Sequence, residues 1–184
     1  MSATPASVVL PVEAADDDRG ERLAVLFDLH EERLYRLARR LTTTGDEARD
    51  LVQETFLKAA GSLKSVPAGF AREEAWLVRV LVNIRRDQWR RAAVRSRSAA
   101  TLRADLAASS DVESAVIAKR LVWSALDLLE PRRRAIVVMH ELEGMAPAAI
   151  AASLGIRVMT VRWHLSMGRR DLKRILEPQM GDRT

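Results

Sequence analysis

The stretch from Pro147 to Arg170, PAAIAASLGIRVMTVRWHLSMGRR, decides the fold of the C-terminal part of this chain. Apolar residues recur at helical spacing on both sides of Leu154-Gly155-Ile156, which predicts two short helices joined by a tight turn. Pro147 suits the first position of a helix, and Gly155 tolerates the positive φ that such a turn needs. Because the second helix carries several arginines on its outward side, the pattern indicates a helix-turn-helix, whose second helix lies in the major groove of DNA. An ordinary helical hairpin with a solvated basic face is the alternative.

The whole sequence predicts an all-α protein of two small helical domains joined by a flexible linker. Apolar residues at helical spacing cover residues 21–41, 46–60 and 74–93 in the first domain, and residues 112–129 and 131–144 in the second. The predicted organisation is a disordered tail over residues 1–20, a helical bundle over 21–93, a linker over 94–110, a helix-turn-helix domain over 111–176 and a short tail over 177–184.

Composition excludes several classes of protein. The 184 residues include no cysteine, which leaves neither a disulfide framework nor a thiolate metal site and suits a cytoplasmic location. No apolar run approaches the roughly 20 residues that a membrane span needs, so membrane insertion is not expected. His30, His140 and His164 are too scattered to hold a metal, and no Gly-rich phosphate loop or paired-carboxylate motif is present. We therefore expect no catalytic residue, no metal and no cofactor, and the chain is not expected to be an enzyme.

Charge along the chain separates into one acidic part and two basic parts. Residues 1–60 contain 12 acidic and 8 basic side chains. Residues 85–103 contain 7 arginines and 1 aspartate, and residues 157–174 contain 6 basic side chains and 1 acidic one. The two basic segments predict a polyanionic partner, and the acidic part predicts a second partner that is basic. Solvated faces are the alternative, although mixed charge would serve solubility better than arginine alone.

Three segments resemble conserved regions of the bacterial sigma-70 family: DEARDLVQETFLKA at 46–59, WLVRVLVNIRRDQWRR at 76–91, and LDLLEPRRRAIVVMHELEGMAPAAIAASLGIRVMTVRWHL at 126–165. Their order, and a linker that leaves no room for a middle domain, are similar to the extracytoplasmic-function (group 4) sigma factors. The resemblance implies a first domain like sigma region 2 and a second like sigma region 4. It also implies a function, in which the protein binds core RNA polymerase, directs it to promoters and promotes DNA opening.

The resemblance assigns exposed side chains to three kinds of contact. The clamp helices and the flap of core RNA polymerase would be the protein partners, with an acidic strip within residues 46–60 facing the clamp helices. The expected contacts are Asp46, Asp50, Gln53 and Glu54 for the polymerase; Lys64, Arg72, Trp76, Asn83, Arg86 and Arg90 for the −10 element; and Arg157, Thr160, Arg162, Trp163, Ser166 and Arg170 for the −35 element. An anti-sigma factor that covers the polymerase-binding faces is also expected, as is a role in stress response.

The second domain departs from the family's pattern at the helix expected to read DNA. Met159 replaces a usual glycine, Trp163 replaces a usual serine, and Met167 stands where an arginine is common. Trp163 is predicted either to face DNA, where it could contact a thymine methyl but could not read guanine as arginine does, or to fold back onto the domain. A stand-alone helix-turn-helix regulator that binds duplex DNA is the alternative function, but it does not explain the acidic strip in a separate domain.

Overall fold

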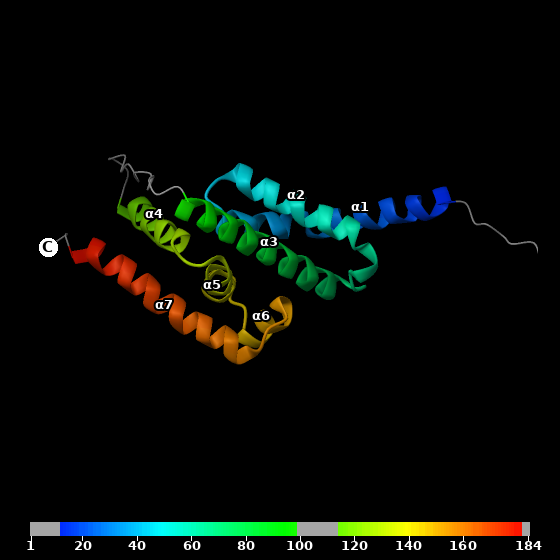
Figure 1. Ribbon diagram of the computed structural model, residues 1–184. Coiled ribbons are helices and arrows are strands. Elements are labelled where there is room, and N and C mark those ends of the chain that lie inside the picture. The colour runs from blue at the N-terminus through cyan, green and yellow to red at the C-terminus, as the bar shows by residue number, and fades with distance from the viewer. Residues whose placement is uncertain (1–11, 99–113, 182–184) are drawn as a thin grey trace, which may run out of the picture.

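A computed structural model describes residues 12–98 and 114–181 of the chain, and every regular element in these two ranges is helical (Figure 1). This confirms the predicted all-α class. The first domain comprises α1 (Val12–Leu41), α2 (Gly45–Gly61), the short 3-10 helix η1 (Leu63–Ser65) and α3 (Phe70–Ser98). The second comprises α4 (Ser114–Asp127), α5 (Pro131–Val137), the π-helical turn η2 (Val138–Leu142), α6 (Pro147–Leu154) and α7 (Val158–Gly181).

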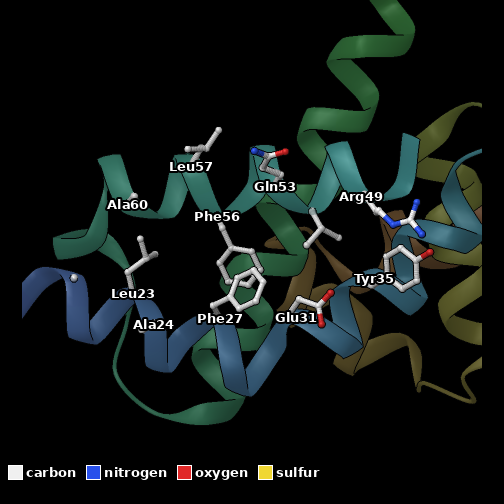
Figure 2. A pocket seen from close by; sticks show the side chains of 12 residues that line it. Leu23, Ala24, Phe27, Glu31, Tyr35, Arg49, Gln53, Phe56, Leu57 and Ala60 are labelled. Carbon is white, nitrogen blue, oxygen red and sulfur yellow. The ribbon is translucent and has the colours of Figure 1, made fainter. Parts of the chain in front are cut away.

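The first domain is a three-helix bundle whose apolar faces meet in one core. Its largest fully buried apolar side chains are Leu26, Leu34, Leu37 and Leu41 of α1, Leu51 of α2, and Leu77, Leu81 and Ile84 of α3. The Thr44 side chain accepts a hydrogen bond from the Glu47 backbone N–H and so caps the start of α2. Phe27 and Phe56 remain at the edge of the core, where α1 and α2 leave an apolar groove between them (Figure 2).

The second domain packs α5 and α6 against the first half of α7. Pro131 opens α5, and the Glu130 carboxylate accepts hydrogen bonds from the backbone N–H groups of Arg132 and Arg133. Gly155 adopts φ +64 between α6 and α7, as the predicted turn requires. Ile150 and Leu154 of α6 are buried in the core, and α6 packs against α7 and against α3 of the first domain. The predicted helix-turn-helix geometry is therefore present.

Gly168, on α7, packs against side chains of α5, and we expect Gly168→Ala to destabilise the second domain. A Cβ at this position would lie 2.6 Å from Cγ2 of buried Val137 and 3.3 Å from Cγ of Arg133. Overpacking of this kind costs about 1–3 kcal/mol, which exceeds the gain of up to about 1 kcal/mol in helix propensity. Urea denaturation should show a lower midpoint for Gly168→Ala. Gly20→Ala is the matched control, since a Cβ at Gly20 meets nothing within 4 Å and should not lower the midpoint.

Several boundaries differ from the sequence-based expectations, and capping explains the clearest case. α1 begins at Val12, within the tail expected over residues 1–20. α3 begins at Phe70, where the Glu73 carboxylate accepts a hydrogen bond from the Gly69 N–H and so caps the helix start. The sequence-based prediction began this helix later, because Pro67 and Gly69 are typical of a loop. α3 also continues to Ser98, into the expected linker, and α7 continues to Gly181. The helix expected over 131–144 is interrupted by η2. Residues 1–11, 99–113 and 182–184 lie outside the described chain.

The two domains contact each other directly, which the expectation of a flexible linker did not anticipate. α3 lies between the rest of the first domain and α5 and α6 (Figure 1). Arg79 of α3 donates to the backbone carbonyls of Ser153 and Ala152 at the end of α6, and its guanidinium lies against Gly155 so closely that a Cβ there would be 2.9 Å from Cζ. The sequence could not reveal this contact, because Arg79 has the same periodicity as a solvated residue.

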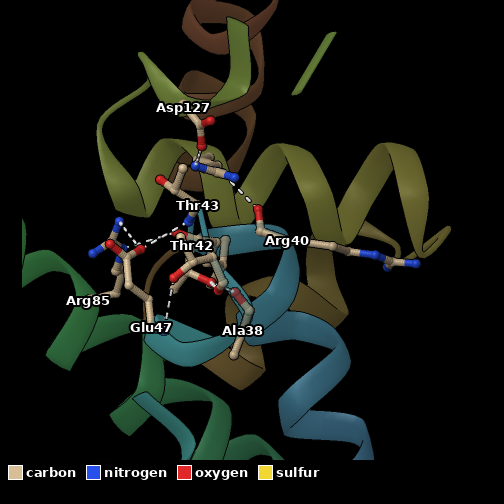
Figure 3. A network of polar contacts seen from close by, with 10 residues as sticks. Ala38, Arg40, Thr42, Thr43, Glu47, Arg85 and Asp127 are labelled. Atoms are coloured by element: carbon tan, nitrogen blue, oxygen red, sulfur yellow. Dashed lines mark hydrogen bonds and ion pairs between the residues drawn. The ribbon is translucent and has the colours of Figure 1, made fainter. Parts of the chain in front are cut away.

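A polar network at the end of α1 adds to this interface (Figure 3). Arg134 of α5 donates to the backbone carbonyl of Arg40 and pairs with Asp127. Arg85 of α3 donates to the carbonyl of Leu41 at 3.0 Å, so arginines from both domains satisfy the last carbonyls of α1.

Glu143, just after η2, forms the ionic centre of the same interface. Its side chain is 5% exposed and pairs with Arg33 at 2.8 Å and Arg40 at 2.9 Å, both from α1. A carboxylate buried to this extent is stable only when it is paired, so Glu143 ties η2 to α1.

Candidate functional site

The acidic strip expected on α2 is present on the surface, but its four members differ in exposure and in the contacts that their side chains make. Asp46 has a side chain that is 90% exposed and pairs with Arg49 at 2.7 Å. Asp50 and Gln53 are exposed, and no ion pair or hydrogen bond engages the Asp50 carboxylate within the described chain. Glu54 is half-buried and accepts a hydrogen bond at 3.0 Å from Gln88 of α3. Asp50 is therefore the carboxylate best placed to meet an external cation.

An apolar groove of about 640 Å³ runs beside this strip, between α1 and α2 (Figure 2). Phe27 of α1 and Phe56 of α2 form its floor, with ring centroids 4.9 Å apart. Leu57 is 64% exposed and Phe27 is 45% exposed, and Gln53 of the acidic strip also lines the groove. Phe27 belongs to the apolar pattern of residues 21–41, which predicts burial, and Leu57 was not singled out by the sequence. The available signal was an apolar residue four positions after Gln53, on the polar face of the same helix.

The six residues expected to meet the −10 element lie along η1 and α3, and the structure presents them unequally. Lys64, Arg72 and Arg90 are exposed. Trp76 is half-buried and packs on the core. Asn83 accepts a hydrogen bond at 3.4 Å from Arg132 of the second domain, and Arg86 bonds to Asp87 at 3.3 Å. The structure thus leaves the two ends of α3 accessible and covers its middle with α5 and α6.

Phe70 at the first turn of α3 is a further candidate that sequence reasoning missed. Its side chain is exposed, and its ring lies 4.8 Å from the ring of buried His30. His30 in turn lies 3.4 Å from the Glu73 carboxylate, and its burial and contacts indicate a structural role. An exposed aromatic ring on a rigid support can stack a nucleic-acid base.

Positive charges gather where α3 meets α5. Burial lowers the pKa of Arg132, and the charges of Arg86 and Arg90 lower it further. Burial also lowers the pKa of Arg134, while Asp127 opposes that shift. All remain cationic, because arginine does not lose its proton in proteins. The mutual repulsion of Arg86, Arg90 and Arg132 would be relieved by a bound polyanion.

The outward face of α7 carries most residues expected to meet the −35 element. Arg157, Arg162, Trp163, Ser166 and Arg170 are exposed, and Thr160 is half-buried. Arg169, by contrast, is engaged with Glu141 of η2 at 2.8 Å. In Figure 1, α7 lies across the molecule from α1 and α2.

Trp163 does not fold into the domain but stays 53% exposed. Arg133 lies over its ring at 5.7 Å, and His164 meets it edge-on at 4.8 Å. Burial lowers the pKa of His164, and the charges of Arg133 and Arg132 lower it further while Glu130 opposes them. The lowered pKa favours the neutral form of the His164 ring beside the exposed indole.

Two kinds of feature are not found in the described ranges. No helix there is long and apolar enough to cross a membrane. Within the same ranges, no three His, Asp or Glu side chains gather as they would around a metal ion.

Family matches agree with the division into two domains. Residues 26–95 match sigma-70 region 2, and residues 119–172 match sigma-70 region 4. A relative, the ECF RNA polymerase sigma factor SigE of Mycolicibacterium smegmatis, is 35% identical over 170 residues, which cover 87% of this chain and 65% of the relative. The ECF RNA polymerase sigma factor SigL of Mycobacterium tuberculosis is 31% identical over 157 residues, which cover 84% of this chain and 89% of SigL.

Solved structures with a similar fold include the sigma factor RpoE in complex with the anti-sigma factor NepR from Bartonella quintana. Its TM-score is 0.58 at 24% identity, covering 88% of this chain and 97% of RpoE. CnrH in complex with the cytosolic domain of CnrY gives a TM-score of 0.56 at 25% identity, covering 85% and 88% of the two chains.

The fold and its exposed faces define a two-domain helical protein with one acidic surface and two basic ones. The matches to sigma-70 regions 2 and 4, which follow each other in this order along the chain, identify the family within this class. The chain belongs to the sigma-70 family, within its extracytoplasmic-function (ECF) group.

Proposed function

We propose that this chain is a promoter-specificity subunit that binds core RNA polymerase, directs it to promoters and promotes opening of the DNA. The observation that carries the proposal is the separation of an acidic surface on α2 from basic faces on α3 and α7 in a chain that matches sigma regions 2 and 4. A polymerase subunit needs both a protein partner and a DNA partner. A stand-alone regulator needs only the face on α7.

The polymerase contact is assigned to the acidic strip Asp46, Asp50, Gln53 and Glu54 together with the adjoining groove. A partner helix with basic residues and one or two large apolar side chains fits both features. Charged residues would steer the encounter, and burial of Phe27 and Leu57 would supply most of the affinity. Clamp helices of the core enzyme are the partner proposed for this surface.

The DNA-opening contact is assigned to α3 and the residues before it. Arginines at the C-terminal half of α3 would hold the phosphate backbone, and Phe70 would stack an unpaired base near Lys64 and Arg72. No catalytic group is needed, since capture of single-stranded bases itself shifts the equilibrium toward open DNA.

The −35 contact is assigned to α7, with α6 supporting it. Arg162 and Ser166 line a hollow beside Pro147 at the start of α6, where Ala146 provides no side-chain cap. Backbone N–H groups that lack a cap, next to an arginine, suit a phosphate of the DNA backbone.

Binding both elements requires the two domains to separate. The elements are named for positions about 25 base pairs apart, which is about 80 Å of duplex at about 3.4 Å per base pair. A compact chain of this length has a radius of gyration of only about 16 Å. Fifteen residues join the two described ranges, and a chain of that length can span at most about 50 Å, which allows the domains to separate once contacts such as Arg79 with α6 are released.

An anti-sigma factor is proposed as the natural competitor of the polymerase. RpoE, which shares the fold, is seen in complex with the anti-sigma factor NepR. A protein that filled the groove between α1 and α2 here would exclude a clamp helix from the same surface.

Replacing Arg86 and Arg90 together by alanine tests the −10 assignment. We expect open-complex formation, followed by permanganate reactivity of unpaired thymines, to fall about tenfold while binding of core polymerase stays unchanged. The slope of log affinity against log salt should fall by roughly 1 for each arginine that meets a phosphate. Arg36→Ala, an exposed arginine on α1, is the control and should leave both measurements unaltered. Equal losses of polymerase binding and DNA opening would refute the assignment.

A further inference from the structure

Two large apolar side chains stand on the DNA-facing side of α7 with no role in the core. Met159 is 68% exposed and Trp163 is 53% exposed. The buried side of the same helix is supplied by Val161, His164 and Leu165 instead. Met159 and Trp163 are four residues apart and therefore lie one above the other on one face of α7.

Positive charge surrounds this apolar pair. Arg162 follows Met159 by three residues on the same face, and Arg157 and Arg170 are exposed before and after the pair. An apolar patch enclosed by arginines needs a partner that offers both negative charge and an apolar group. It suits the major groove, where phosphates line both edges and the floor holds one kind of apolar group, the C5-methyl of thymine.

The indole of Trp163 is held in place before any DNA arrives. Arg133 of α5 covers one face of the ring at 5.7 Å, and Arg133 is itself fixed by an ion pair with Asp171. The His164 ring meets the indole edge-on at 4.8 Å. A side chain fixed in this way loses little conformational entropy on binding, which favours specific contact.

We infer that Met159 and Trp163 determine specificity within the −35 element by contacting the methyl groups of thymines. This inference rests on the proposed function, because it assumes that α7 enters the major groove at the −35 element. The two side chains are separated by about 6 Å along the helix, against about 3.4 Å per base pair. They therefore meet two thymines that lie one or two base pairs apart, on the same strand or on opposite strands.

The test uses the full chain assembled with core polymerase, on a promoter chosen by mapping its transcription start sites. Each thymine of the −35 element is replaced in turn by deoxyuridine, which pairs identically and lacks only the C5-methyl. We expect one or two replacements to weaken promoter binding about fourfold each, as removal of one buried methyl-sized group implies. The same replacement in the spacer between the two elements is the control and should have no effect.

Variants of Met159 and Trp163 identify which side chain contacts which thymine methyl group. The holoenzyme carrying Trp163→Ala should bind the thymine promoter several-fold more weakly and should no longer distinguish thymine from deoxyuridine at one sensitive position. Met159→Ala should do the same at the other position. The inference is overturned if every thymine tolerates deoxyuridine, if the selected −35 elements contain no thymine, or if Trp163→Ala stays fully sensitive to the missing methyl.

A different partner for the patch would give a different result. Met159 and Trp163 could instead bind a protein surface of the polymerase. Trp163→Ala would then weaken the holoenzyme equally on the native promoter and on a promoter with a scrambled −35 element. That result would show that the inference is wrong. Failure of the proposed function is seen separately, since the unaltered chain would then form no complex with core polymerase and give no start sites.

Discussion

Asp50→Arg is expected to weaken binding of core RNA polymerase at least tenfold, about 1.4 kcal/mol, while the fold is retained. Asp50 is exposed and has no ion pair within the described chain, so its replacement breaks no internal contact. Reversal of a charge that faces a cation at close range turns an attraction of about 4 kcal/mol, at an effective dielectric constant near 20, into a repulsion. Fluorescence anisotropy of the labelled chain titrated with core polymerase would measure the affinity.

Two variants make this result specific. Asp50→Asn removes the charge without adding one and should show a smaller loss. Glu177→Arg makes the same charge reversal at an exposed position on α7 and should bind core polymerase normally. Glu54 is a poorer choice, because its bond to Gln88 couples it to α3 and its reversal would disturb the bundle. Wild-type affinity in a folded Asp50→Arg variant would show that the polymerase binds elsewhere.

Locking the two domains together is expected to reduce promoter-dependent transcription more than tenfold. The chain contains no cysteine, so Arg40→Cys with Glu143→Cys introduces one unique pair across the interface. The native side chains at these positions approach to 2.9 Å, which places two thiols within reach of a reducible bis-maleimide linker. The locked chain cannot place α3 and α7 on elements about 80 Å apart, although its acidic strip stays exposed.

Reduction of the linker supplies the internal control for this experiment. Activity should return on cleavage, because neither Arg40 nor Glu143 is assigned to DNA or polymerase contact. Core binding through α2 should persist in the locked state. Full transcription by the cross-linked chain would show that the domains need not separate, and would remove that step from the proposed function.

The sequence was sufficient to predict those helices and turns whose ends are determined by residues nearby in the chain. The turn at Gly155 follows from a residue that tolerates positive φ, and α2 begins at Gly45, one residue before the predicted start. The start of α3 at Phe70 was missed because the cap involves Glu73, four residues after Gly69, inside a segment with loop-like composition.

The site was predictable only in part, for a physical reason. Exposure of Asp50, Arg90 and Arg162 follows from helical period, because each lies opposite an apolar stripe. The hydrogen bond from Arg132 to Asn83 does not follow from helical period, because contacts between domains depend on the three-dimensional arrangement of distant segments. The groove beside Phe27 was hidden for the same reason: an apolar residue at the edge of a stripe is exposed or buried according to how two helices splay.

Binding of the purified chain to bacterial core RNA polymerase, followed by mapping of the start sites that the assembled enzyme uses on genomic DNA, is the experiment that decides the proposed function. A sigma factor should form a stable complex and produce new start sites, each preceded by a −10 and a −35 element. Absence of core binding, together with tight sequence-specific binding of duplex DNA by the chain alone, would contradict the proposed function and establish a stand-alone helix-turn-helix regulator instead.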